Sequence, residues 1–247
     1  MLAVAWFALF QLRHDLSGRG IACVSGSPLV IETQVLKGIG KSRELVLWMC
    51  DAEKHDADID PEAYTCPDET TGHFYRGRTS VSLVDAVTKN VINTVPVTAS
   101  WPNDGTFDIP YKIAGFFYHV AGPLNKYHEG KPTIMWLKDY NGDGEATEFA
   151  LFEASNCTIV ETTLFGYSRP QDRVIQYPIH LLQREGSITK PRDRPWVDHL
   201  FINKPESPGH WKWQYQYHVG GLTHFDIRYV PAKEEFEGEI VIDPEPL

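Results

Sequence analysis

Hydrophobic and polar residues alternate along most of the chain, in short stretches separated by clusters of Gly, Pro, Asn and Asp. A period of two is typical of strands that bury one face, whereas helices need apolar residues at every third or fourth position. Long stretches with helical spacing are missing. The pattern therefore predicts an all-β protein, with an antiparallel β-sandwich or jelly-roll-like fold built from consecutive hairpins and a closed β-barrel as the alternative.

Pairs of alternating stretches predict the individual hairpins. They are 28–36 with 43–50, 77–84 with 91–98, the two apolar runs that flank residues 139–148, and 157–167 with 173–182. One or two further strands are expected in 106–120. The polar, proline-rich stretch 186–208 predicts a lid-like loop or a linker.

The last hairpin allows its register to be predicted. Residues 211–217 are aromatic at every second position, and 225–229 are apolar at every second position. Only an odd number of loop residues puts these two faces on the same side of the sheet. A three-residue loop at 219–221 pairs Tyr215 with Phe225 and Trp213 with Ile227. The opposite face then carries Lys212, Gln214, Gln216, His218, His224, Asp226 and Arg228.

The chain length of 247 residues suits a single β domain with a substantial core. Residues 1–12 are as apolar as the centre of a secretory signal but too short to span a bilayer, and no basic residue precedes them. We therefore expect a possible signal or N-terminal segment in 1–22 and one β domain in 23–247. No other stretch is apolar enough to predict a transmembrane segment.

The formal net charge of −10 argues against nucleic acid or an anionic membrane as a partner, because no basic excess is present to neutralise phosphates. The four cysteines contain no Cys-x-x-Cys motif, which favours disulfides in an exported protein over a zinc site. We expect Cys50 to pair with Cys66 and Cys23 with Cys157. Closing the polar loop between Cys50 and Cys66 would contribute on the order of 3 kcal/mol. Four buried thiols are the alternative.

Residues 139–148 have the composition of a calcium loop. Asp139, Asn141 and Asp143 occupy alternate positions and a glycine follows directly, so a tight turn can point carboxylate and amide oxygens inward. Glu148 is the candidate for the closing acid, with Glu145 as a further contributor. The alternative is a polar hairpin turn that binds no metal.

The Asp-x-Asn-x-Asp-Gly spacing resembles dockerin and EF-hand loops and the FG-GAP loops of integrin-like propellers. The closing acid comes later in the first type, between helices, and one position earlier in the second, inside a hairpin. The expected strands on both sides favour the second resemblance. Four short sequence stretches, at 64–70, 81–85, 138–144 and 148–152, also resemble a group of secreted bacterial proteins. This resemblance does not imply an activity.

A second candidate site lies on the polar face of the last hairpin. His224, Asp226, Arg228 and Gln216 could converge there for acid–base chemistry on a sugar or for binding of a carboxylate. The simpler interpretation is the solvent-facing side of a sheet whose aromatic side is buried. The reverse arrangement would expose the aromatic row as a glycan platform.

The sequence therefore predicts a secreted, periplasmic or cell-surface β protein that is stabilised by Ca²⁺ and has a binding role, with a polysaccharide or another cell-surface component as the partner. A lyase or hydrolase acting on polysaccharides is the first alternative. A structural module of a cell-surface assembly is the second.

Overall fold

The computed structural model describes residues 21–24, 26–56, 73–98, short strands between 107 and 120, and residues 132–154, 159–217 and 220–243. Within this part of the chain the elements are strands and one 3-10 turn, η3 (Leu200–Ile202), which confirms the all-β prediction. The described residues contain no helix of the length and apolarity needed to cross a membrane. Most of the segment 1–22 lies outside the described residues.

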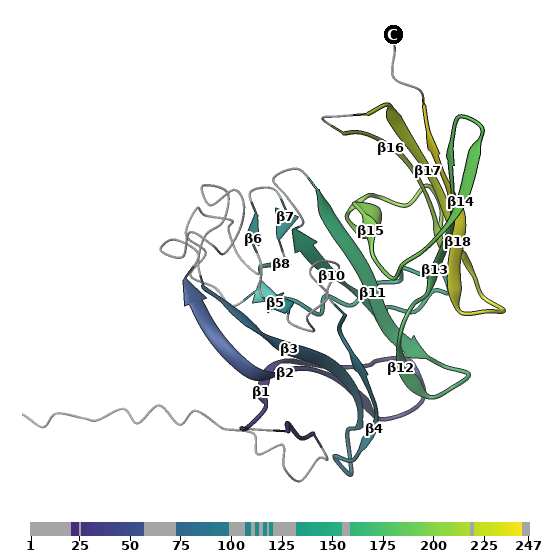
Figure 1. Cartoon of the computed structure of the whole chain (residues 1–247). Coiled ribbons are helices and arrows are strands. Elements are labelled where there is room, and N and C mark those ends of the chain that lie inside the picture. Colours follow the sequence, from purple (N-terminus) through teal and green to yellow (C-terminus); the bar gives the residue numbers. More distant parts are fainter. Residues whose placement is uncertain are drawn as a thin grey trace, which may run out of the picture.

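The described residues form three main sheets (Figure 1). Sheet 1 has the order β1 (Leu29–Val35), β2 (Arg43–Asp56), β3 (His73–Asp85), β4 (Val91–Pro96), and β5 (Phe107–Ile109) also pairs with β3. The order of sheet 2 is β10 (Glu148–Ala154), β11 (Val160–Ser168), β12 (Arg173–Gln176), and β15 (Val197–Asp198) also pairs with β11.

Sheet 3 has the order β14 (Ile188–Asp193), β13 (Ile179–Glu185), β18 (Glu235–Ile242), β17 (Leu222–Val230), β16 (His210–Gln216). Two small pairs complete the strands: β6 (Lys112–Ile113) with β7 (Phe116–Phe117), and β8 (His119–Val120) with β9 (Pro132–Thr133). The strand order of each described sheet has open ends, so none of these sheets closes into a barrel.

Sheet 2 is the middle layer of the packing. One of its faces packs against sheet 1 in a core that includes Leu47, Leu83, Leu151 and Phe165. The other face packs against sheet 3 in a second core. Every residue of β11 is buried, as expected for a strand covered on both sides. The fold is thus a β-sandwich extended by a third layer.

The hairpins predicted for β1–β2, β3–β4 and β11–β12 are confirmed. The predicted strand 173–182, however, is interrupted at Tyr177 and Pro178, and its halves belong to sheets 2 and 3. Proline cannot donate to a strand ladder, so the chain can leave one sheet there and enter the next. As a result β12 and β13 lie in different layers of the fold. The alternation of hydrophobic and polar residues along the chain cannot reveal this change of sheet.

Two further expectations are corrected. The stretch 186–208 is not a loop, because β14, β15 and η3 lie within it. Pro191 is compatible with β14 because this strand is the edge of sheet 3. The fold is also not built from consecutive hairpins alone, because β13 and β18 pair in parallel across a large distance in sequence.

The disulfide joins Cys23 to Cys50, so the predicted pairing was wrong. Ile21 packs on the outer face of sheet 1 with Trp48 and Val84 in a small third core, and Cys23 lies against it. This packing brings the Cα atom of Cys23 within 5.7 Å of that of Cys50. Cys66 and Cys157 lie outside the described residues.

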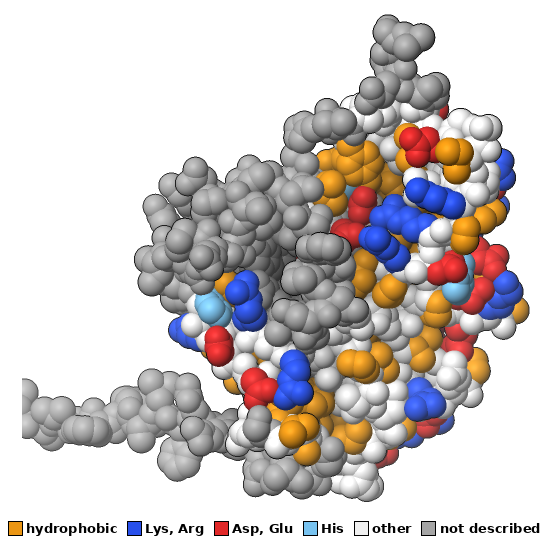
Figure 2. All heavy atoms as spheres, viewed as in Figure 1, with side chains coloured by type: hydrophobic (Ala, Val, Ile, Leu, Met, Phe, Trp, Pro, Cys, Tyr) orange, Lys and Arg blue, Asp and Glu red, His pale blue; other side chains and the backbone are white. Residues whose placement is uncertain are grey.

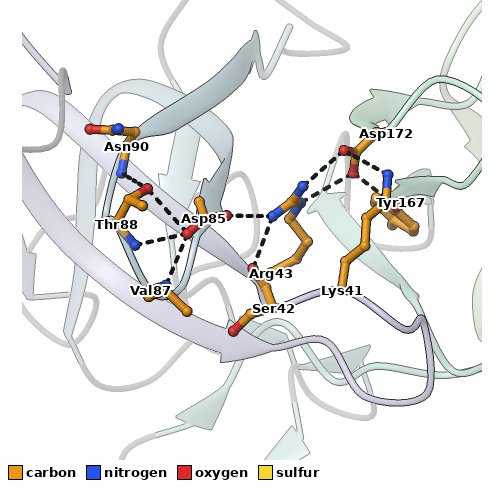
Figure 3. Close-up of polar contacts among 9 residues, drawn as sticks. All are labelled: Lys41, Ser42, Arg43, Asp85, Val87, Thr88, Asn90, Tyr167 and Asp172. Carbon is orange, nitrogen blue, oxygen red and sulfur yellow. Dashed lines mark hydrogen bonds and ion pairs between the residues drawn. The ribbon is translucent and has the colours of Figure 1, made fainter.

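A polar network joins sheet 1 to sheet 2 (Figure 3). Arg43 of β2 donates from Nε to Asp172 Oδ1 over 3.1 Å and from Nη2 to Oδ2 over 2.9 Å. Its Nη1 donates over 2.6 Å to Asp85, at the end of β3. Lys41 and the Tyr167 hydroxyl also contact Asp172. Asp172 lies in the β11–β12 turn, so one carboxylate connects two layers.

A single amide side chain makes a second connection between these two sheets. Asn93 of β4 donates from Nδ2 to the carbonyl oxygen of Val174 over 2.8 Å and accepts the Val174 N–H over 2.9 Å. These are the two bonds that a neighbouring strand would make with β12. Asn93 therefore continues the strand ladder of sheet 2 with a side chain.

Candidate calcium loop and binding surfaces

The predicted calcium loop is closed by a single β-bridge and is followed by strand β10. Lys138 N donates to Glu148 O over 2.8 Å, and Glu148 N donates to Lys138 O over 3.2 Å, directly before β10 continues. Gly142 and Gly144 have positive φ angles of 79° and 91°, which glycine adopts without strain. The expected strand follows the loop as β10, but residues 134–138 before the loop form no strand and meet β10 only at the Lys138–Glu148 bridge, so the predicted hairpin is present only in part.

The first acid of the loop holds its turn together. Asp139 accepts the Gly142 N–H at Oδ1 over 2.7 Å and the Gly144 N–H at Oδ2 over 2.9 Å. Each oxygen of an ionised carboxylate has two lone pairs, so these bonds leave acceptor capacity on both oxygens. These two hydrogen bonds fix the orientation of the Asp139 carboxylate, and each of its oxygens can still accept another bond or bind a cation.

The middle of the loop is organised by Asn141. Its Oδ1 accepts the Asp143 N–H over 2.9 Å, while its NH₂ group donates to Asp143 Oδ2 over 3.0 Å and to Glu148 Oε1 over 3.3 Å. One amide thus connects two carboxylates. The three predicted ligands Asn141, Asp143 and Glu148 form one hydrogen-bonded cluster.

Glu148 is the most unusual residue of the loop, because its side chain is fully buried at 0% exposure. Its carboxylate also accepts the Tyr140 N–H over 3.0 Å and the Thr147 hydroxyl over 2.5 Å. Burial is the main cause that raises the pKa of Glu148 to about 8, and the nearby Asp143 carboxylate adds to this. No cationic side chain pairs with Glu148 among the described residues.

Glu145, unlike the other predicted ligands, forms an ion pair with a residue outside the loop. Its carboxylate pairs with the guanidinium of Arg169, which lies in the β11–β12 turn. This contact connects the loop to the middle sheet. A second connection is steric, because a Cβ atom at Gly142 would lie 2.6 Å from the backbone of Pro208 and Gly209. The loop is therefore packed between neighbours on two sides.

The donor set of the loop suits a hard cation, since carboxylate and amide oxygens are the ligands that Ca²⁺ accepts. The buried Glu148 side chain has no cationic partner among the described residues, and a nearby positive ion would favour its ionised form, which burial disfavours. In the described geometry, however, no three His, Cys, Asp or Glu side chains converge closely enough to hold a metal ion. Cation binding would thus require the acids of the loop to move closer together.

The second predicted site lies on the outer face of sheet 3, and its residues do not converge. Asp226 accepts from His210 Nε2 over 2.8 Å, and Arg228 lies 3.5 Å from the same carboxylate. His224 pairs instead with Asp243 over 2.8 Å. Gln216 donates to the carbonyl oxygens of the β16–β17 loop. His218, the other histidine predicted on this face, lies outside the described residues.

The register of this hairpin explains part of the difference. Trp213 pairs with Phe225 and Gln214 pairs with His224, so the strands are shifted by two residues from the prediction. The intervening residues 217–221 are odd in number, and the aromatic and apolar faces do lie on the same side. Parity was thus predicted correctly and the loop length was not.

The aromatic row of β16 changes from buried to accessible along the strand. Trp211 is buried in the core at 1% exposure, whereas Trp213, Tyr215 and Tyr217 are half-buried. Trp213 stacks on Phe225 with ring centroids 4.3 Å apart. The end of β16 therefore offers aromatic surface, which is neither the fully buried nor the fully exposed arrangement considered from the sequence.

A polar group that the sequence did not indicate lies next to these rings. We call it the Asp198 cluster, and it consists of Glu161, Arg192, Arg194, Asp198 and Tyr217. Glu161 and Asp198 face each other on β11 and β15 and are 6% and 7% exposed. The Tyr217 hydroxyl donates to Asp198 Oδ2 over 2.5 Å. Arg192 and Arg194 approach Asp198 and Glu161 to 3.8 Å and 4.0 Å.

The Asp198 cluster exists because sheet 3 is curved. Arg192 belongs to β14 and Tyr217 follows β16, and these are the two edge strands of the sheet, yet both contact Asp198. The segment with Val197, Leu200 and Phe201 fills the space inside the curve as part of the second core. Figure 2 shows hydrophobic, acidic and basic side chains side by side over β15 and β16.

These contacts join residues far apart in sequence, so no local motif could have revealed them. The aromatic alternation of 211–217 was the one available signal. It indicated the aromatic rings beside the Asp198 cluster and none of the charged residues. No family model, no curated protein and no solved structure matches the chain. The functional argument therefore rests on the geometry of the loop and of the Asp198 cluster.

Proposed function

We propose that the chain is an exported β protein whose hairpin at 138–148 is stabilised by Ca²⁺ and whose role is to bind glycans. The observation that carries the calcium part is the fully buried carboxylate of Glu148, which lacks a cationic partner among the described residues. It lies in one hydrogen-bonded cluster with Asn141 and Asp143. Asp139, Asn141, Asp143 and Glu148 would supply oxygen ligands, and Glu145 would contribute through its backbone or through an exchange with Arg169.

The ion would neutralise neighbouring carboxylates that otherwise repel one another. Because the loop packs against Pro208 and Gly209 and contacts Arg169, this neutralisation would stabilise the junction of sheets 2 and 3. The Cys23–Cys50 disulfide supports export, because such bonds persist in oxidising compartments.

Glycan binding is supported by the half-buried rings at the end of β16. Trp213, Tyr215 and Tyr217 combine apolar faces with the polar groups of the Asp198 cluster, a combination that suits sugars. The hydrolase or lyase alternative has less support, because His224 and Asp226 are held by different partners.

The calcium proposal is tested by thermal unfolding in excess EGTA and in millimolar CaCl₂. A ligand that binds only the native state stabilises it by about 2.7 kcal/mol at a hundredfold excess over Kd, so Tm should rise with calcium. The double variant Asp139→Asn/Asp143→Asn should lose this rise, while Asp243→Asn, on the outer face of sheet 3, should keep it. Identical melting curves of the wild type in EGTA and calcium would refute the proposal.

The binding role is tested with a glycan array probed with and without calcium, followed by turnover assays on every glycan that binds. Binding without turnover is the expected result. An array without any bound glycan would contradict the binding role, and turnover would favour the enzyme alternative.

A further inference from the structure

The Asp198 cluster contains two guanidinium groups whose donors are barely used. Arg192 and Arg194 approach their acids only to 3.8 Å and 4.0 Å, which is beyond hydrogen-bond distance. Neither guanidinium group donates a hydrogen bond to a described residue. The Arg192 side chain is only 22% exposed. The Arg194 side chain is 59% exposed, so both guanidinium groups have N–H donors that are accessible to an acceptor from outside the chain.

The geometry of the cluster selects the kind of acceptor. A guanidinium presents parallel N–H groups that match the two oxygens of a carboxylate. Lys190 projects from the same face of β14 as Arg192, because alternate residues of a strand share a face. These three cations balance the carboxylates of Glu161, Asp198 and Glu153, the cross-strand neighbour of Glu161, although the whole chain has a net charge of −10.

The tyrosines and the two carboxylates of the cluster can contact the other parts of a sugar that carries such a carboxylate. Tyr217 is neutral, because burial and the Asp198 carboxylate raise its pKa above the ordinary value. Its ring lies 4.7 Å from that of Tyr215, in an edge-to-face arrangement, and both rings are half-buried. Aromatic rings offer apolar surface to sugar C–H groups, and the carboxylates of Asp198 and Glu161 can accept hydrogen bonds from sugar hydroxyls.

We propose that the Asp198 cluster binds a uronic-acid unit of an acidic saccharide, with Arg192 and Arg194 holding its carboxylate and the sugar ring lying against the neighbouring rings of Tyr215 and Tyr217. This inference rests on the proposed glycan-binding role and adds the class of glycan and its position. It does not depend on the calcium loop, which lies at the opposite end of β10 from Glu153, the cross-strand neighbour of Glu161.

The test is calorimetric titration of the full chain with trigalacturonic acid and with its fully methyl-esterified form, which has the same rings and hydroxyls without the charge. The acid should bind at least about tenfold more tightly than the ester, because hydrogen bonds to charged groups are the stronger ones. Arg192→Gln and Arg194→Gln should each weaken binding of the acid about tenfold and leave binding of the ester unchanged.

Two further variants separate recognition from folding. Arg192→Lys keeps the charge and loses the planar fork, so it should also weaken binding while the circular dichroism spectrum stays native. Arg184→Gln removes an arginine from the outer face of the same sheet, where it pairs with Glu239, and should bind the acid like the wild type.

Three results would overturn the inference. They are equal affinity for acid and ester, wild-type affinity in both glutamine variants, and binding of neutral glycans on the array without binding of the acid. The last result would leave the proposed glycan-binding role standing. Absence of binding to any glycan would refute both proposals.

Discussion

Replacing Asp172 with asparagine removes the charge that joins sheet 1 to sheet 2 and keeps the shape of the side chain. Asp172 has a positive φ of 49°, a conformation that asparagine also tolerates. The substitution should therefore leave the backbone conformation of the turn unchanged. The variant loses ion pairs with Arg43 and Lys41, whose nitrogens lie 2.9 Å and 2.8 Å from the carboxylate (Figure 3).

The size of the effect follows from the exposure of this pair. Hydrogen bonds to charged groups contribute roughly 1.5–3 kcal/mol when they are buried. The Asp172 side chain is 29% exposed and that of Arg43 is 14% exposed, so solvent screens part of this contribution. We therefore expect Asp172→Asn to lower the free energy of unfolding by about 1–2 kcal/mol at pH 7.

The pH dependence gives the sign of the effect. Hydrogen bonds from Arg43 and Lys41 hold the pKa of Asp172 well below its usual range. A carboxyl group with a lowered pKa in the folded state stabilises the fold above its unfolded pKa of about 3.9. The contribution is lost as the pH falls through the folded pKa. The difference between wild type and variant should therefore be constant from pH 7 to about 5 and shrink below about 4.

Urea unfolding at several pH values measures this difference. Asp193→Asn is the matched control, because Asp193 is an exposed partner of His180 and should change stability little. Wild-type stability of Asp172→Asn at pH 7 would refute the reasoning. So would a loss of stability that stays the same at pH 2.

Two other substitutions test the packing. Gly238→Ala places a Cβ atom 2.2 Å from the carbonyl oxygen of Asp226, so it should lower the free energy of unfolding by roughly 1–3 kcal/mol in urea unfolding. An unchanged midpoint would contradict the close approach of β17 and β18. Asn93→Ala removes both bonds to the backbone of Val174 and should cost about 1–3 kcal/mol in the same assay, whereas an unchanged midpoint would mean that these bonds do not join the sheets.

The local parts of the fold were predictable from the sequence, because alternation and turn residues act within one hairpin. The pairs β1–β2, β3–β4 and β11–β12 follow from this information. The parallel pairing of β13 with β18 does not, since it joins strands that are far apart in sequence. β14 lies in the polar, proline-rich stretch 186–208 that predicted a loop, and its residues are mostly exposed at a sheet edge.

The candidate sites divide in the same way. Asp139, Asn141 and Asp143 are close in sequence, so their spacing already indicated one loop. Asp198 and Arg192 meet only because sheet 3 curves around the segment with η3, and the curvature is a property of the whole sheet. The disulfide was predicted wrongly for a similar reason, because Ile21 and Cys23 pack on the outer face of sheet 1 against residues far along the chain.

The calcium content of the purified chain tests the central claim most directly. After equilibrium dialysis against millimolar CaCl₂, elemental analysis should find about one calcium ion per chain in the wild type and close to none in Asp139→Asn/Asp143→Asn, because these acids supply the ligand oxygens of the loop. A wild-type chain without bound calcium would contradict the claim. Equal calcium content in wild type and variant would assign the ion to another site.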